Sequence, residues 1–194
     1  MSGILSVSDE KIYTSEILIN KSRFLCFVKH INNAQEAEDF LREKRNEFKD
    51  ARHICYAYRV QNSGKLSDDG EPSGTAGMPI MEVLEKQGLS SIIAVVVRYF
   101  GGIKLGAGGL LRAYTGAVTE CLKTVKKVLW EQAKIYQKSM EYKQYKPFLN
   151  SIKNRKIRIL DTQFDTGAEI RFVASVTEEI VDASFVKDTV FAFD

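Results

Sequence analysis

The segment RYFGGIKLGAGGLLRAY, residues 98–114, joins two elements that the sequence predicts clearly. Before it, Ile92–Val97 is continuously aliphatic, as expected for a strand that is buried on both faces. The middle of the segment, Gly101–Gly109, is a glycine-rich loop. After it, apolar residues recur at helical spacing, namely Leu110, Tyr114, Ala117, Val118 and Cys121. The sequence therefore predicts a buried strand, a glycine-rich loop and an amphipathic helix in succession.

A loop in this position can bind an anion, because free backbone N–H groups at the start of a helix point outward. Arg98, Lys104 and Arg112 bracket the loop and could add charge-assisted hydrogen bonds to phosphate. The loop is not a P-loop, since no Gly-Lys-Ser/Thr follows, and it does not match GxGxxG. The alternative is that the glycines only allow the strand and helix to pack tightly. We predict a phosphate or nucleic-acid contact that involves Arg98, Lys104, Arg112, Gly101, Gly102, Gly106, Gly108 and Gly109.

A second polar loop, DDGEPSGTAG, covers residues 68–77 and precedes a helix that we expect from Pro79 to about Lys86. Its carboxylates could bind a divalent cation or act in acid–base chemistry. They could equally cap the helix, because negative charge is favoured at a helix N-terminus. We favour the capping interpretation, expect no metal, and keep an acidic candidate site of Asp68, Asp69, Glu71, Ser73 and Thr75.

The segments on either side of these loops complete a first domain. Glu16–Ile19 and Arg23–Val28 predict a hairpin, Asn33 is placed to cap a helix, and Arg52–Val60 alternates like a strand. His53 and Cys55 share a face of that strand, where they could serve as a base and a nucleophile. No orienting group is evident, so we interpret them as a packed pair and predict no catalytic residue.

The charge distribution and the pattern both change near residues 123–129. Residues 123–158 carry 11 Lys and Arg against 2 acids, whereas residues 159–194 carry 2 against 8. This asymmetry is typical of a polyanion binder, or else of a lysine-rich face that the acidic tail neutralises. We place the domains at 1–127 and 128–194. The second domain predicts the ferredoxin-like order βαββαβ, with strands at 130–145, 156–164, 168–176 and 190–193 and helices at 146–154 and 178–187.

The composition excludes several classes of protein. Hydrophobic residues make up 44% and charged residues 27%, and the net charge is +3, as in an ordinary globular chain. The longest aliphatic run is too short to span a membrane. Met1–Glu10 lacks a basic start and an apolar core, so we expect no secretion signal. Three widely spaced cysteines, without ligand-like spacing to either histidine, predict reduced thiols in the cytoplasm and no metal site.

Four motifs resemble the YigZ/IMPACT family: SRF at 22–24, HICYAYR at 53–59, and the two loop segments at 68–77 and 98–114. The resemblance is strong over residues 15–122. The remainder is weakly similar to the smaller C-terminal domain of the bacterial YigZ branch. The family resemblance implies an α+β fold in two domains. The first domain should be ribosomal-protein-like and similar to the fourth domain of elongation factor G, and the second should be ferredoxin-like and similar to the fifth domain of that factor.

The resemblance also implies a connection with translation, because eukaryotic IMPACT members restrain activation of a stress kinase. We see no segment that resembles the RWD-type N-terminal domain of those members, so we do not expect that role to transfer directly. Our first hypothesis is a non-enzymatic regulator, without a cofactor, that binds RNA or the ribosome, with a protein partner in translation control as a further option. The alternative is an enzyme or binding protein for a phosphorylated small molecule that uses both loops. A third is a protein-binding adaptor in which the loops are purely structural.

Overall fold

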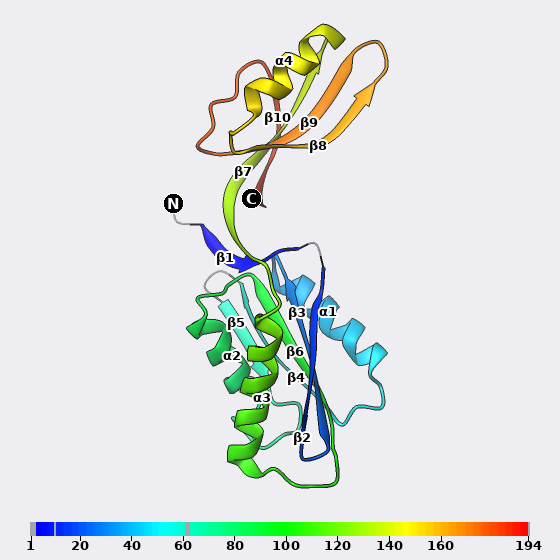
Figure 1. The fold of residues 1–194 in the computed structure, drawn as a ribbon, viewed down its shortest axis with the longest axis vertical. Helices are drawn as coiled ribbons and strands as arrows, with labels where there is room; N and C mark the ends of the chain where they lie inside the picture. Colours follow the sequence, from blue (N-terminus) through cyan, green and yellow to red (C-terminus); the bar gives the residue numbers. More distant parts are fainter. Residues whose placement is uncertain (1–2, 10, 61–62, 194) are drawn as a thin grey trace. The chain divides into compact units, whose positions relative to one another are not determined.

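The computed structural model describes residues 3–9, 11–60 and 63–193. Its contacts divide the chain into two compact units, one from Ile4 to Lys127 and one that begins at Val128 and includes Gly3 (Figure 1). The prediction that there is no secretion signal rests partly on Met1, Ser2 and Glu10, which lie outside the described residues. Within the described part of the chain, no helix combines the length and the hydropathy needed to cross a bilayer.

The first unit is built on an antiparallel sheet in the order β2-β3-β6-β4-β5. Its strands are β1 (Ile4–Val7), β2 (Tyr13–Ile19), β3 (Ser22–His30), β4 (His53–Val60), β5 (Ser63–Ser67) and β6 (Ile92–Tyr99), with β1 outside that order. Its helices are α1 (Ala34–Glu47), α2 (Gly77–Lys86) and α3 (Gly106–Leu122). This mixture of helices and a mainly antiparallel sheet makes the unit α+β.

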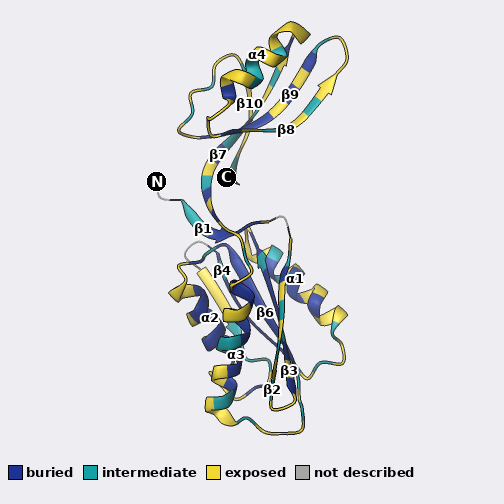
Figure 2. Cartoon of the chain, viewed as in Figure 1, coloured by how far each residue is buried: buried dark blue, intermediate teal, exposed yellow. Residues whose placement is uncertain are grey.

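The central strand β6 is buried along both faces, which confirms the prediction for Ile92–Val97. One face, which includes Ala94 and Val96, packs under α2 and α3. The opposite face, which includes Val95 and Val97, packs under α1. Figure 2 shows the dark, buried strands between helices whose outer sides are exposed. The strand reads as a continuous aliphatic run because each face has its own hydrophobic core.

Local signals before the loops are also confirmed. Asn20 and Lys21 form the turn of the β2–β3 hairpin with φ of 47° and 64°, as a type I′ turn requires. The Asn33 side chain accepts a hydrogen bond from the backbone N–H of Glu36 at 2.9 Å and so caps α1. The first unit nevertheless contains strands that we did not predict, β1 and β5. The residues of β5 are mostly polar and exposed, and they carry no hydrophobic alternation.

The glycine-rich loop is shorter than predicted. We expected it to run to Gly109, but α3 already begins at Gly106. Gly108 and Gly109 are therefore helical residues, although glycine is a weak helix former. Gly102 and Gly106 have φ of +84° and +71°, so these two positions do favour glycine. Their turn ends the loop and starts the helix.

The second unit consists of β7 (Lys127–Met140), α4 (Tyr142–Ile152), β8 (Ile157–Phe164), β9 (Ala168–Ser175) and β10 (Ser184–Ala192). The strands pair in the order β10-β7-β9-β8. β9 thus lies between β7 and β8, as in a split βαβ unit. One core packs under α4 and contains Ile170 and Phe172.

The helix predicted at 178–187 is wrong. The carboxylate of Glu178 accepts hydrogen bonds from the Arg155 side chain at 2.8 Å and from the backbone N–H of Lys156 at 2.9 Å. These bonds hold the start of the segment as a loop, and Asp182 has a positive φ of 56° that interrupts any helix. The last strand consequently begins at Ser184 and not at 190. The described residues of this unit form no second helix of the ferredoxin-like order. The likeness of both units to domains of elongation factor G stays a prediction.

Candidate functional site

The two loop segments of the family motifs meet at a pocket of about 600 Å³ in the first unit. The pocket lies where β4 begins, β6 ends and α3 begins. We call it the loop pocket, and its lining residues are Arg52, His53, Gly70, Glu71, Pro72, Arg98, Phe100, Lys104, Leu105, Gly106, Ala107 and Leu110. His53 and Arg98 are direct partners in the β4–β6 register, which explains why residues 45 positions apart share one wall.

Asp68 organises the acidic loop from within. Its carboxylate accepts hydrogen bonds from the backbone N–H groups of Gly74 at 2.8 Å, Ala76 at 3.0 Å and Gly77 at 2.8 Å. Burial raises the pKa of Asp68, but these three bonds to the ionised form outweigh it and lower the pKa below its usual range. Asp68 thus supplies the N-terminal anion that α2, without a side-chain cap of its own, would otherwise lack.

The other polar groups of the acidic loop serve the loop itself. The Asp69 carboxylate accepts a hydrogen bond from the backbone N–H of Ile54 at 2.7 Å. The backbone carbonyl oxygen of Asp69 lies 2.8 Å from Nδ1 of His53. The Thr75 hydroxyl donates to the carbonyl of Pro72 at 2.6 Å, while Ser73 is exposed. Across the described residues, no group of three or more His, Cys, Asp and Glu is arranged to hold a metal ion. These contacts support the capping interpretation of the loop.

Glu71 differs from its neighbours because its side chain is only 3% exposed and pairs across the pocket wall. Oε1 accepts hydrogen bonds from Arg98 at 2.5 Å and from the Tyr114 hydroxyl at 2.9 Å. Nε2 of His53 lies 4.0 Å from Oε2. One carboxylate therefore joins the acidic loop, β4, β6 and α3. Sequence reasoning grouped Glu71 with the other acids, since nothing in the spacing separates a buried carboxylate from a capping one.

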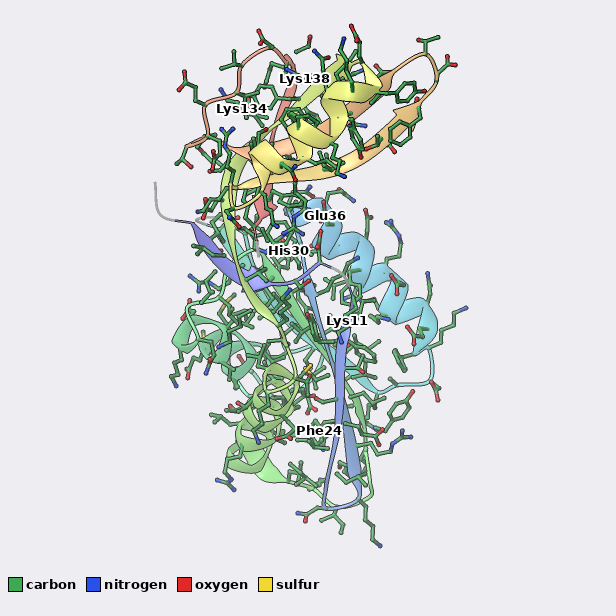
Figure 3. All side chains as sticks on the ribbon, turned by 45° about the horizontal axis from the view of Figure 1, so that its top comes forward. Lys11, Phe24, His30, Glu36, Lys134 and Lys138 are labelled. Atoms are coloured by element: carbon green, nitrogen blue, oxygen red, sulfur yellow. The ribbon has the colours of Figure 1, made fainter. Side chains whose placement is uncertain are left out.

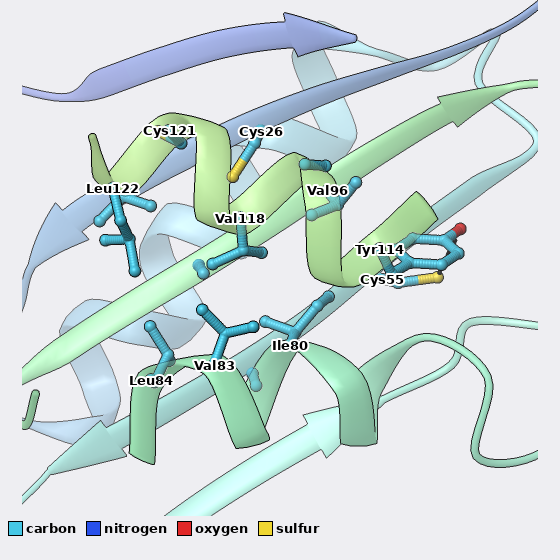
Figure 4. Close-up of a cluster of buried hydrophobic side chains, with 14 of the residues drawn as sticks. Cys26, Cys55, Ile80, Val83, Leu84, Val96, Tyr114, Val118, Cys121 and Leu122 are labelled. Atoms are coloured by element: carbon cyan, nitrogen blue, oxygen red, sulfur yellow. Dashed lines mark hydrogen bonds between the residues drawn. The ribbon is translucent and has the colours of Figure 1, made fainter. Parts of the chain in front are cut away.

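Cys55 and Tyr114 continue this network into the core, where Figure 4 shows them side by side. The Cys55 thiol lies 3.3 Å from the Tyr114 hydroxyl and 3.0 Å from the carbonyl of Asp68. Burial raises the pKa of both groups well above their usual range. A thiol that stays protonated is a poor nucleophile, which supports our interpretation of Cys55 as a packed residue. Cys26 and Cys121 are likewise free and buried.

Arg98, which we predicted to contact phosphate, is not free at the surface. It is 5% exposed, and its guanidinium carbon lies 5.4 Å from the ring centroid of Phe24 and 5.7 Å from that of Phe100. Its charge is compensated by Glu71. Its Nε is nevertheless buried without a hydrogen-bond partner among the described residues. Arg98 therefore belongs to the wall of the loop pocket.

Some of the remaining residues of the glycine-rich loop line the loop pocket, and others only allow the backbone to take its path. Lys104 and Gly106 line the pocket, and α3 begins there with no side-chain cap at Leu105. A Cβ on Gly101 would lie 2.0 Å from the backbone of Lys21, so this glycine lets the loop cross the β2–β3 turn. Of the residues predicted to contact phosphate, Gly101, Gly102, Gly108, Gly109 and Arg112 do not line the pocket; of the acidic candidate site, Asp68, Asp69, Ser73 and Thr75 do not. Arg112 is exposed on the first turns of α3.

Sequence reasoning missed Arg52, His53 and Phe100 as pocket residues. Arg52 and His53 stand at the start of a predicted strand, and Phe100 stands between Arg98 and the loop glycines. The sequence did offer a signal for Phe100, because it places a large apolar side chain directly before the glycine-rich loop. In the structure that side chain is 45% exposed. The other two could be found only from the strand register.

Comparison with known proteins identifies the fold around this pocket. The model of the Impact N-terminal domain matches residues 20–122, more than half of the chain. The chain belongs to the IMPACT family. It is 40% identical to the IMPACT family member YvyE of Bacillus subtilis, over 87% of this chain and 78% of that protein. It is 46% identical to the IMPACT family member YigZ of Escherichia coli over 54% of each.

A solved structure extends the likeness of this IMPACT chain to both units. The crystal structure of a hypothetical protein covers 91% of this chain and 87% of its own, with a TM-score of 0.67 and 32% identity. The two-domain translational regulator Yih1 is similar over 58% of this chain and 47% of its own, with a TM-score of 0.39 and 23% identity. That second likeness is too low to support an argument. The loop pocket lies entirely within the residues that match the Impact domain.

Outside the Impact domain, contacts partly neutralise the basic stretch at 123–158. Arg155 pairs with Glu178 at 2.8 Å, and Lys156 pairs with Glu131. On β7, Lys138 donates to the carbonyl of Asp182 at 2.8 Å and Lys134 lies over the ring of Phe185; Figure 3 labels both lysines. Of these contacts, one pairs a cation with a carboxylate of the acidic tail, Arg155 with Glu178, which agrees with the alternative interpretation for that residue.

Proposed function

We propose that this IMPACT chain is a non-enzymatic, translation-associated regulator that binds RNA or the ribosome through the loop pocket and its basic rim. The observation that carries the proposal is the set of cations at this site. Arg52 and Lys104 line the pocket and Arg112 lies on the adjoining turn of α3. The family resemblance supplies the link to translation.

The rim cations support phosphate binding because no acid neutralises them. Arg52, Lys104 and Arg112 make no ion pair or hydrogen bond within the part of the chain that the structure describes, and Lys104 and Arg112 are exposed. Cations of this kind contribute affinity for a nucleic-acid backbone with little sequence preference. The start of α3 adds the positive end of a helix dipole to the same place.

The buried groups support binding in preference to covalent chemistry. The charge of Glu71 is engaged by Arg98, and burial raises the pKa of the thiol and the phenol beside it. Neither Cys55 nor Tyr114 is poised to lose its proton near neutral pH. The network fixes the wall of the pocket, and the exposed cations remain to contact a ligand.

The test is co-sedimentation with ribosomes, and binding to free tRNA, over a series of salt concentrations. We expect salt-sensitive binding that weakens strongly in the double variant Lys104→Glu/Arg112→Glu. The slope of log affinity against log salt should fall by about one for each phosphate that the variant no longer neutralises. Arg45→Glu is a single-reversal control, because Arg45 is an exposed cation with no ion pair among the described residues and lies on α1, which covers the opposite face of the sheet.

Two results would contradict the proposal. If the parent protein binds neither ribosomes nor tRNA at low salt, the proposal of RNA binding is wrong. If it binds but the double variant behaves like the parent and like Arg45→Glu at every salt concentration, the contact surface lies elsewhere on the chain.

A further inference from the structure

We propose that the loop pocket holds a single nucleotide that carries a terminal phosphate monoester, with the phosphate at the start of α3 and the base against Phe100. This inference rests on the proposed function and specifies which part of a nucleic acid enters the pocket. The same chemistry is present in the phosphorylated end of an RNA and in a free nucleoside monophosphate.

The phosphate end is defined by donors of three kinds in one wall. Gly106 and Ala107 line the pocket at the uncapped start of α3, where backbone N–H groups lack intrahelical acceptors. Lys104 stands next to them. Arg98, also in this wall, retains a buried Nε without a partner among the described residues. Together these donors suit an anion with several acceptor oxygens.

The charge of the site favours a monoester over a phosphodiester. A terminal phosphate carries about −1.5 to −2 charges near neutral pH, whereas a linkage within a chain carries one. Glu71 offsets Arg98, so the uncompensated positive charge comes from Arg52, Lys104 and the dipole of α3. Oε1 of Glu71 accepts hydrogen bonds from Arg98 and Tyr114, and Oε2 lies 4.0 Å from Nε2 of His53. The carboxylate charge is thus compensated by Arg98 within the wall.

The opposite part of the pocket suits an aromatic ring. Phe100 is 45% exposed although it lines a concave site, and the Arg98 guanidinium carbon lies over its ring at 5.7 Å from the centroid. Pro72, Leu105 and Leu110 add apolar surface around it. Bases stack on exposed aromatic side chains of this kind in single-stranded nucleic-acid sites. A volume of about 600 Å³ is in the range of small-ligand sites, so it suits one nucleotide and not a folded RNA segment.

The experiment measures fluorescence anisotropy with one short single-stranded RNA prepared in three forms: 5′-phosphorylated, 3′-phosphorylated, and with hydroxyls at both ends. We expect one phosphorylated form to bind about tenfold more tightly than the hydroxyl form, as the loss of charge-assisted hydrogen bonds predicts. Lys104→Ala should abolish most of that preference. Arg45→Ala, which removes a cation on α1, should leave it unchanged.

Phe100 supplies an independent test of the base. Phe100→Leu keeps an apolar side chain beside Arg98 but removes the ring, and it should weaken binding of the phosphorylated and hydroxyl forms alike by about tenfold. Thermal unfolding of each variant checks that the fold is retained. Adenosine monophosphate and inorganic phosphate, added as competitors, distinguish a nucleotide from a bare phosphate.

The outcomes separate this inference from the proposed function. Equal, salt-sensitive binding of all three RNA forms, insensitive to Phe100→Leu, would overturn the inference and leave RNA binding intact. Binding of adenosine monophosphate but of no RNA would support the nucleotide site and overturn the RNA proposal. Competition by inorganic phosphate as strong as that by the nucleotide would overturn the role of the base.

Discussion

Glu71 is the residue on which the loop pocket depends, because a single buried carboxylate holds groups from four segments. Arg98 and Tyr114 both donate hydrogen bonds to the same atom, Oε1 of Glu71. A buried ion pair of this kind gives little net stability as a pair, but the loss of one partner leaves a buried charge without compensation. The pair therefore fixes the geometry of the pocket wall.

We predict that Glu71→Gln destabilises the protein by about 3–5 kcal/mol, since Arg98 then stays buried without a counter-charge. Denaturant unfolding measures this free energy. Glu16→Gln is the control, because Glu16 and Arg23 form an exposed pair at 2.8 Å that water already screens. If Glu71→Gln lowers the free energy of unfolding no more than Glu16→Gln does, the role assigned to the buried Glu71–Arg98 pair is wrong.

A second residue, Asp68, gives the protein a defined pH dependence. Its folded pKa is lowered, so its contribution to stability is complete above the usual value of 3.8 and is lost as the pH falls through the lowered folded value. Asp68→Asn should therefore unfold more easily than the parent at pH 7. The difference in unfolding free energy between the two should shrink below about pH 4. A difference that stays constant down to pH 2 would show that the Asp68 charge is not what holds the loop.

At the residue scale, the sequence located the loops but not the roles of their side chains. Spacing put Arg98 next to the glycine-rich loop and Glu71 among three acids. Only the antiparallel register of β4 and β6, together with the packing of α3, shows that these two residues meet below the surface. Contacts between distant segments leave no local pattern, which is why Arg52 and His53 were not predicted to line the same pocket as the loops.

At the scale of elements, the strand–loop–helix unit formed by β6 and α3 carries the site. The continuous aliphatic run at residues 92–97 was sufficient to predict the strand, and the helical spacing of apolar residues at 110–121 was sufficient to predict the buried face of the helix. The boundary of α3 was not predictable, because glycines at 108 and 109 suggest a loop. In the structure, tertiary packing on the sheet outweighs that weak helix propensity.

The glycines of this unit should respond differently to substitution. A Cβ at Gly101 would meet the backbone of Lys21 at 2.0 Å, so Gly101→Ala should destabilise by about 1–3 kcal/mol. At Gly108 the nearest atom is the end of the flexible Arg112 side chain at 3.6 Å, and φ is not positive. Gly108→Ala should therefore stabilise α3 by up to about 1 kcal/mol. Thermal unfolding of both variants checks this, and equal effects would contradict the different roles of the two glycines.

The second unit shows where element prediction fails for a physical reason. Residues 178–187 were predicted as a helix, but the Glu178 carboxylate bonds to Arg155 and to the backbone of Lys156. These tertiary bonds, together with the pairing of β10 to β7, outweigh any helical preference in the segment. Strands β8 and β9 were predictable because Asp165, Thr166 and Gly167 form a turn sequence between them.

At the scale of the whole molecule, charge is distributed unevenly between the two units. The stretch at 123–158 is the most basic part of the sequence, yet several of its cations contact acids or carbonyls of the second unit. The rim of the loop pocket has fewer cations, but they are free of acidic partners within the described residues. Local charge density in the sequence therefore differs from the distribution of unpaired cations on which we base the proposed RNA contact.

We predict that Lys146→Glu/Lys153→Glu weakens RNA binding less than Lys104→Glu/Arg112→Glu. Both pairs change the net charge equally and both consist of exposed side chains. A non-specific attraction to the basic stretch would make the first pair at least as damaging as the second. Parallel salt titrations of the two double variants distinguish the two cases.

The most direct test of the account is to map the RNA contact by NMR chemical-shift perturbation on the isotope-labelled full chain. We expect a short single-stranded RNA to shift the backbone amides of Lys104, Gly106 and Ala107 most strongly, together with the Arg98 Nε–H signal. These shifts should fade as salt is added. Perturbations confined to α1 or to residues 128–193, with the start of α3 unchanged, would contradict the central claim that RNA binds at the loop pocket.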